Sequence, residues 1–297
     1  MTTLSENKIN NDKENKDNCV YISHFSALKH WDLPLVKQYY QDIIDSIKIY
    51  EVLIRSRKVN HAKNGVKTYL NRKHVPQNGL MTVNNKKIVS PYLLFLQLSE
   101  NMDILETILM GNLFCSKYDG PFSQECLDVV KLRKFVEAAK GHKGRQKAMR
   151  ALQYVQNGAC SIMEIFVHMF FSLPLMLGGR AIKGGYFNYK VILTEELAEA
   201  LDKEVLFIDY CFPDKKIAYE YLGEYHNQSV DQDSKRNLIL KRMGFDVNTI
   251  TKSQLYDKNN LKQLLMHVQK IHNKRNYIRT KEHEKNFHKL WLLLPGN

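Results

Sequence analysis

The chain lacks the features that mark membrane proteins, secreted proteins and zinc-binding proteins. Among its 297 residues, no apolar run free of charge approaches about 18 residues, so we expect no membrane span and no membrane partner. Residues 1–18 are polar and charged, unlike a signal peptide. The five cysteines are scattered and include no C-x-x-C pair, which indicates reduced thiols instead of a disulfide framework or a zinc site. We therefore expect a cytoplasmic protein.

Acidic residues are fewer than basic ones, and this imbalance suggests a polyanionic partner. The chain has 44 Lys and Arg against 31 Asp and Glu, which gives a net charge of +13. Such an excess favours binding to nucleic acid, and a basic surface without a partner is the simpler alternative. Hydrophobic residues make up 44% of the chain, which is enough to form a globular core.

Composition divides the chain into five segments. Residues 1–18 are rich in Asn, Lys and Glu and are expected to be a disordered tail. Residues 19–90 combine a short helical unit with a basic hairpin, which predicts a winged-helix-like DNA-binding module; a small α+β subdomain with a solvated charged face is the alternative. A helical linker domain is expected at 91–157, an α/β domain at 158–271 and a basic C-terminal helix at 272–297.

The linker domain contains a basic stretch that a glycine-rich turn interrupts. Its first helix is expected to start at Ser90 and Pro91, a cap followed by a first-turn proline. Lys143 and Arg145 lie in the turn further along. Basic residues at this density predict phosphate contacts, and a solvated helix face is the alternative. Both residues are therefore candidates for binding nucleic acid.

Two acidic residues lie within apolar segments of the C-terminal third. We expect Asp209 to end a strand that begins at Val205, and Glu220 to lie in a second strand, Ile217–Leu222. Pro and Asp in the turn at 212–215 favour a hairpin. Desolvating two adjacent carboxylates is costly unless a cation or hydrogen-bond donors compensate. A divalent metal ion is the simplest such cation.

A third acidic residue precedes this hairpin. Ser161 is expected to cap a helix, and Glu164, three residues later, matches a capping box. The alternative assigns Glu164 to the metal site. Across residues 158–271 the predicted order is helix–strand–strand–strand–helix–strand, which predicts an α/β fold with a central mixed sheet.

These motif residues resemble the restriction-endonuclease-like PD-(D/E)xK superfamily, in particular small bacterial domains related to the very-short-patch mismatch-repair endonuclease. The matching residues between 158 and 265 are Ser161-Ile162-Met163-Glu164, Asp209, Glu220-Tyr221-Leu222-Gly223 with His226, and Asp233-Ser234-Lys235-Arg236. The resemblance implies a mixed sheet flanked by helices. The preceding region, expected to be mainly helical, more loosely resembles antitoxins of the AbiEi type. That second likeness is carried by Ser23-His24 with Ser26-Ala27-Leu28, by Leu33-Pro34 and by the Ser90-Pro91 helix start.

The resemblance implies a metal-dependent DNA endonuclease that acts in repair or phage defence. Glu164, Asp209 and Glu220 would hold Mg²⁺ or Mn²⁺ through oxygen ligands. Asp209 and Glu220 would be catalytic together with His226, which would orient or deprotonate the attacking water. Double-stranded DNA is the preferred partner, and a homodimer is one option for the oligomeric state.

The helix after the second strand carries the remaining motif residues. Asp233 and Arg236 lie about one helical turn apart, which favours an internal ion pair, with a phosphate contact by Arg236 as the second option. Lys235 and Arg236 complete the candidates for binding nucleic acid.

One position departs from the family pattern. Leu222 stands two residues after Glu220, where the pattern has a lysine or an acidic residue. Either His226, Lys215 or Lys235 supplies the missing group, or the domain has lost hydrolysis. The alternative function is therefore a DNA-binding transcriptional regulator or antitoxin-like protein with an inactive nuclease fold. An RNA-directed nuclease is a third option.

Overall fold

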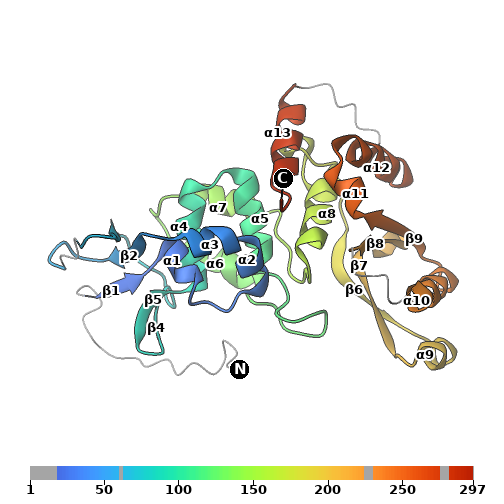
Figure 1. Ribbon diagram of the computed structural model, residues 1–297, viewed down its shortest axis with the longest axis horizontal. Helices are drawn as coiled ribbons and strands as arrows, with labels where there is room; N and C mark the ends of the chain where they lie inside the picture. The colour runs from blue at the N-terminus through green and yellow to red at the C-terminus, as the bar shows by residue number, and fades with distance from the viewer. Residues whose placement is uncertain (1–18, 60–62, 224–229, 275–280, 297) are drawn as a thin grey trace. The chain divides into compact units, whose positions relative to one another are not determined.

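The structure is a computed structural model that describes residues 19–59, 63–223, 230–274 and 281–296. Contacts divide the chain into two compact units, here called unit 1 (Met1–Phe114 with Cys126–Val155) and unit 2 (Cys115–Glu125 with Gln156–Asn297). Each unit has its own mixed sheet and its own helices (Figure 1). The expected α/β class is therefore confirmed for the described residues. None of their helices is long and apolar enough to cross a membrane.

Unit 1 contains a five-stranded sheet in the order β3-β2-β1-β5-β4. Its strands are β1 (Val20–Ile22), β2 (Tyr50–Ile54), β3 (Val66–Leu70), β4 (Leu80–Val83) and β5 (Lys86–Val89). Strand β1 pairs antiparallel with β2 and parallel with β5, while β2 and β3 are parallel and β4 and β5 antiparallel. The sheet is therefore larger than the single basic hairpin that the sequence predicts.

The helices of unit 1 form most of its core. They are α1 (His24–Leu28), α2 (Pro34–Tyr39), α3 (Gln41–Ser46), α4 (Pro91–Asn101), α5 (Ile104–Phe114), α6 (Val129–Ala138) and α7 (Arg145–Ala151). The start of α4 is as predicted, because Ser90 Oγ accepts a hydrogen bond from the Leu93 amide at 3.3 Å and Pro91 takes the first position. Almost every side chain of α4 and α5 is buried. These two apolar helices are the centre of the unit.

Unit 2 contains a four-stranded sheet in the order β6-β7-β8-β9. Its strands are β6 (Tyr186–Ile192), β7 (Val205–Phe212), β8 (Ile217–Leu222) and β9 (Asp246–Thr251), and its helices are α8 (Ile162–Ser172), α9 (Glu195–Leu201), α10 (Val230–Arg242), α11 (Lys252–Tyr256), α12 (Lys258–Ile271) and α13 (Lys281–Leu292). Strand β7 is antiparallel to both β6 and β8, whereas β8 is parallel to β9 through the α10 crossover. The predicted helix–strand–strand–strand–helix–strand order is present, with α9 inserted.

Helices cover both faces of this sheet (Figure 1). On one face, α9 and α10 contribute to an apolar cluster that comprises Val191, Leu193, Leu197, Leu206, Ile208, Cys211, Ala218, Ile239 and Leu240. On the other face, Phe171 of α8 contacts Tyr210 and Tyr219 with ring centroids 6.1 and 4.9 Å apart. Within the predicted C-terminal helix, α13 buries Phe287 and Leu290 and so belongs to the core of unit 2.

The first strand of the hairpin is longer than predicted. Strand β7 continues past Asp209 to Phe212, and its last three residues pair with β8 in the register that joins Tyr210 to Tyr219. The prediction that the strand ends at Asp209 is therefore wrong. Three further apolar and aromatic residues are buried between the sheet and its helices, and their burial extends the strand.

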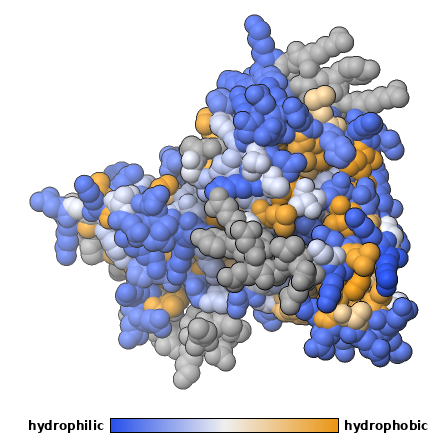
Figure 2. Space-filling model, turned by 45° about the vertical axis from the view of Figure 1, so that its right-hand side comes forward, coloured by the Kyte–Doolittle hydropathy of each residue, from blue (hydrophilic) through white to orange (hydrophobic). Residues whose placement is uncertain are grey.

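The surface is mixed in character. On the face shown in Figure 2, apolar residues lie in patches between hydrophilic ones. Among the described residues, Phe122 and Ile192 have large apolar side chains that are 79% and 72% exposed. Exposed apolar residues of this kind are common on globular domains and indicate no site by themselves.

Gly185, just before β6, provides a test of the packing around Tyr210. A Cβ atom at Gly185 would collide with the Tyr210 hydroxyl group, which forms a 2.9 Å hydrogen bond with His168 Nδ1. We predict that Gly185→Ala lowers the free energy of unfolding by roughly 3 kcal/mol or more, because the buried ring must move and lose this bond.

The adjacent Gly184 is the matched control for this test in urea denaturation. Its φ is +87° and no atom lies within 4 Å of a built Cβ. Gly184→Ala should therefore cost only the left-handed strain, roughly 1–2 kcal/mol. Equal losses in the two variants would contradict the packing argument.

Candidate functional site

The three predicted acidic residues lie on neighbouring elements of unit 2. Glu164 is in the first turn of α8, Asp209 is in β7 and Glu220 is in β8. Glu164 and Glu220 are only 6% and 7% exposed, whereas Asp209 is half-buried. We call these three residues the acidic cluster; Asp209 is its most accessible member.

The hairpin ladder opens where two of these acids lie. Its pairing stops at Tyr210 and Tyr219, although the same register would place Asp209 opposite Glu220. Beyond that point, the backbone N–H groups donate to side-chain carboxylates and not to carbonyl oxygens of the opposite strand. The Tyr221 N–H donates to Asp209 Oδ2 at 2.9 Å, and the Asp209 backbone N–H donates to the Glu220 carboxylate. Each acid is therefore held by the main chain of the opposite strand.

Asn188 is a site residue that the sequence analysis missed. The register between β6 and β7 places it beside Asp209, and its φ of 44° is unusual for a non-glycine residue within a strand. Its Nδ2 donates to Glu164 Oε2 at 2.6 Å and to the Gly158 carbonyl oxygen at 2.9 Å. The only signal in the sequence was one amide in the stretch Tyr186–Ile192, which is otherwise aromatic or apolar except for Lys190.

Glu164 contributes to the start of α8 in a modified way. Ser161 Oγ accepts a hydrogen bond from the Glu164 amide at 3.1 Å, which is the first half of the predicted capping box. In place of the second half, Glu164 Oε2 accepts from the Cys160 amide at 2.8 Å. The carboxylate therefore turns toward the residues before the cap, on the side of Asn188.

Burial and charge repulsion raise the pKa of two members of the acidic cluster. Desolvation is the main cause of the rise in the Glu164 pKa to about 8, and the negative charge of Asp209 adds to it. For Glu220, the same two causes in the same order raise the pKa to about 7. Asp209 is therefore the charge to which both buried acids respond.

Arg236 of α10 is the partner of Glu220. Its Nη1 lies 2.8 Å from Oε2 and its Nη2 lies 2.9 Å from Oε1, an arrangement that lowers the Glu220 pKa against the two causes above. Arg236 also donates to the Phe207 carbonyl oxygen. The side chain of Asp233, its expected partner, lies outside the described residues.

The remaining predicted residues of unit 2 are more peripheral or are not described. His226 lies outside the described residues. Lys235 is exposed on α10, and Leu222 is 38% exposed. Lys215 Nζ donates to the carbonyl oxygen of His272 at 3.1 Å. Lys215 is one of the three residues that the sequence suggested as substitutes for the missing lysine. Its ammonium group is instead hydrogen-bonded to the backbone at His272.

Lys143 and Arg145 lie in unit 1, apart from the acidic cluster in the chain. Lys143 is exposed, and its Nζ lies 3.3 Å from Glu100 Oε1. Arg145 donates from Nε to the Val136 carbonyl oxygen and from Nη2 to the Glu137 carbonyl oxygen, both at 3.0 Å. Arg145 therefore satisfies carbonyl groups at the C-terminal end of α6.

The acidic cluster has the donor chemistry of a magnesium or manganese site, since both ions prefer carboxylate oxygens. Within the described ranges, no group of three or more His, Cys, Asp or Glu side chains is arranged so that it could hold a metal ion. Arg236 engages both oxygens of Glu220, and Glu164 Oε2 is engaged by an amide and a backbone donor. The electrostatics nevertheless fit a cation, because the charge of Asp209 raises the pKa of two buried neighbours.

Comparison with protein-family models, curated proteins and solved structures found no match to this chain. The resemblance to the PD-(D/E)xK superfamily therefore stays a prediction that rests on the motif residues.

Replacing Glu164 by Gln should reduce the dependence of stability on pH. The folded pKa of about 8 lies above the ordinary value of 4.5, so the stability that this group contributes is complete below about pH 4.5 and is lost as the pH rises through about 8. Glutamine keeps an oxygen for its two donors but cannot ionise. We predict that Glu164→Gln is more stable than wild type by roughly 2–4 kcal/mol at about pH 8.5, and that the gap closes near pH 5.

Urea denaturation across this pH range measures the difference. Glu196→Gln is the matched control, because Glu196 is exposed on α9. Parallel pH profiles for Glu164→Gln and wild type would show that Glu164 is not held above its ordinary pKa.

Proposed function

We propose that the chain is a metal-dependent nuclease that hydrolyses phosphodiester bonds of DNA, and that unit 2 is its catalytic domain. The observation that carries this proposal is the acidic cluster, in which Asp209 lies between two buried acids where the ladder from β7 to β8 opens. The elements around it follow in the order α8-β6-β7-β8-α10-β9. The motif residues on α8, β7, β8 and α10 therefore occur in the order of the PD-(D/E)xK pattern, which supports the proposal.

Glu164, Asp209 and Glu220 would hold Mg²⁺ or Mn²⁺. When bound, such an ion supplies neutralisation of charge on the scissile phosphate and a bound water of lowered pKa. Other residues of the chain position the carboxylates that would bind the ion. Asn188 orients Glu164 through its 2.6 Å hydrogen bond, and the Tyr221 amide orients Asp209. Both supports are rigid, since one comes from a strand and the other from a backbone group.

Arg236 supplies the positive charge that Leu222 does not. Its guanidinium group lies against Glu220, two residues before Leu222, and is held there by two hydrogen bonds to the carboxylate. Lys235 is exposed on the same helix. Arg236 is therefore the described cation best placed for this role, in which it counteracts the rise in the Glu220 pKa and holds the carboxylate in position.

DNA is the substrate that the charge of the chain favours. A net charge of +13 concentrates a polyanion at the surface and gives salt-dependent binding. A second function, DNA binding without hydrolysis, is favoured by one observation: both oxygens of Glu220 are engaged by Arg236. Both functions require DNA binding, and they differ in whether the acidic cluster cleaves the bound DNA.

Plasmid nicking by the purified full chain distinguishes these functions. We predict cleavage with Mg²⁺ or Mn²⁺ and none with EDTA. The cleavage rate should fall about 100-fold or more in Asp209→Asn and in Glu220→Gln, because loss of a metal ligand should cost at least as much activity as loss of a residue that orients one. Glu196→Gln serves as the control of equal charge change. Intact DNA binding without cleavage by wild type would favour the regulator, and cleavage that persists in both variants would rule out this site.

Arg236 and Leu222 allow a second test. Arg236→Ala leaves the buried Glu220 carboxylate without its cation, so we predict a loss of stability of roughly 3–5 kcal/mol together with loss of cleavage. Adding Leu222→Lys returns a cation two residues from Glu220 on the same strand and should restore part of both losses.

The matched control is Leu222→Met in the same Arg236→Ala background, which changes packing but adds no charge. Recovery with methionine as well as with lysine would mean that charge is not the cause. Full cleavage by Arg236→Ala would remove Arg236 from the site.

A further inference from the structure

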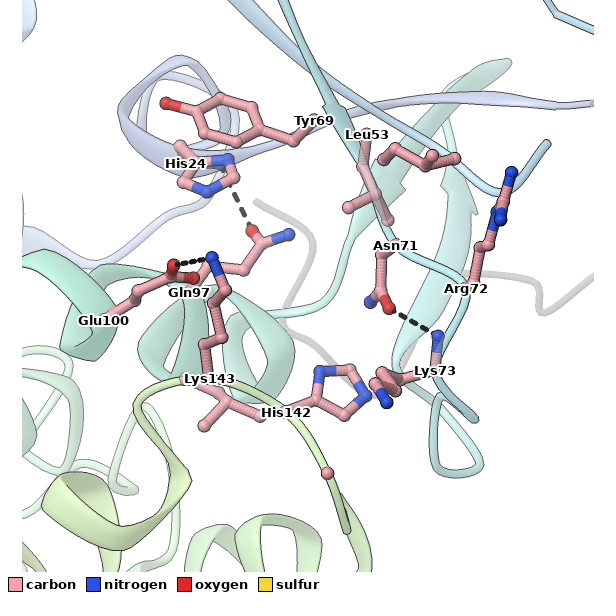
Figure 3. Close-up of a pocket in the computed structure, with 13 residues that line it drawn as sticks. His24, Leu53, Tyr69, Asn71, Arg72, Lys73, Gln97, Glu100, His142 and Lys143 are labelled. Atoms are coloured by element: carbon pink, nitrogen blue, oxygen red, sulfur yellow. Dashed lines mark hydrogen bonds and ion pairs between the residues drawn. The ribbon is translucent and has the colours of Figure 1, made fainter. Parts of the chain in front are cut away.

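Unit 1 contains a cavity of about 340 Å³ that the proposed nuclease function does not use. Residues from α1, β2, β3, α4 and the turn before α7 line it, as Figure 3 shows. A cavity of this volume is in the range of small-molecule sites. Every lining residue belongs to unit 1, so the cavity can be described from that unit alone.

A buried amide without a hydrogen-bond partner lies in the wall of this cavity. Gln97 of α4 is 8% exposed, and its Oε1 accepts a hydrogen bond from the His24 amide at 3.3 Å. Its Nε2 is buried and has no partner among the described residues. Figure 3 shows the Gln97 amide group directed into the space that faces Asn71. A native buried donor without a partner requires an explanation, and a ligand acceptor provides one.

His24 beside it has a strained backbone. Its φ is 49°, in the left-handed region, and its ring stacks on Tyr69 with centroids 3.6 Å apart. Burial, with a smaller contribution from Lys67, lowers the His24 pKa to about 4, so the ring is neutral at physiological pH. Strained residues that line a cavity are typical of ligand sites. His24 therefore shapes the wall without adding charge.

The charged residues of the lining are mainly basic. Arg72, Lys73 and Lys143 line the cavity against one acidic residue, Glu100, which lies 3.3 Å from Lys143 Nζ. His142 adds no charge near neutral pH, because burial lowers its pKa. The lining therefore carries an excess of positive charge that an anion would balance.

Asn71 adds a further polar group. Its Oδ1 accepts a hydrogen bond from the Lys73 amide at 2.8 Å, an arrangement that leaves the Nδ2 of the same amide for another acceptor. Together with Gln97 Nε2, this gives the cavity two neutral donors beside its cations. Phosphate oxygens accept from both kinds of group.

We propose that this cavity binds a nucleoside phosphomonoester, either a free nucleotide or the 5′-phosphorylated end of a nucleic-acid strand. The phosphate oxygens would accept from Gln97 Nε2 and balance the charge of Lys73. A phosphate alone would fill only part of the volume, which leaves room for the attached nucleoside. This site does not depend on the acidic cluster of unit 2.

Isothermal titration calorimetry of the full chain in EDTA tests the proposal. The probes are AMP, adenosine, inorganic phosphate, and a single-stranded oligonucleotide with either a 5′ phosphate or a 5′ hydroxyl. Gln97→Glu keeps an oxygen for the His24 amide but replaces the donor with negative charge, so the affinity for the phosphomonoester should fall at least about 10-fold. Lys73→Ala should also weaken binding, whereas Lys29→Ala, an exposed lysine of unit 1 outside the lining, should not.

The probes also separate the two sources of the phosphate. AMP binding without oligonucleotide binding identifies a free nucleotide, and preference for the 5′-phosphorylated over the 5′-hydroxyl strand identifies a strand end. Either result supports the site. Absence of binding by every phosphorylated probe, or equal binding of the two oligonucleotides without AMP binding, would overturn it. If Gln97→Glu does not fold, equal affinities of Lys73→Ala and Lys29→Ala would overturn it instead.

Discussion

Unit 2 depends on how its sheet accommodates buried carboxylates. Where the hairpin ladder would continue, Asp209 and Glu220 accept hydrogen bonds from the backbone of the opposite strand, so the acids replace the main-chain acceptors that the open ladder lacks. Burial still disfavours their charge, as the raised pKa values of Glu164 and Glu220 indicate. At Glu220, the guanidinium group of Arg236 offsets part of this cost.

The two units carry opposite local charge. The acidic cluster of unit 2 is a group of carboxylates in which Asp209 raises the pKa of its neighbours, whereas three basic residues and one acidic residue line the cavity of unit 1. In the two proposals, the first would hold a cation and the second an anion. A nuclease that also binds phosphorylated ends or nucleotides would use both, although each site rests on its own observations.

Several elements could be predicted because their signals are local. The cap at Ser90 with Pro91 starts α4, as the sequence suggested. The acidic residues were also found, since charged groups within apolar strands stand out. The end of β7 was placed wrongly at Asp209, because an acidic residue in sequence signals a strand end while the burial of the three following residues decides otherwise.

What the sequence determined by itself was therefore the order of elements, the helix starts and the identity of the three acids, all of which follow from neighbours a few positions apart. The tertiary structure decided which groups meet. Arg236 pairs with Glu220, Asn188 supports Glu164, and Gln97 binds the His24 backbone 73 positions away. Such contacts depend on strand register and on the packing of helices against the sheet, and these are set by burial of the whole core, which no local pattern encodes.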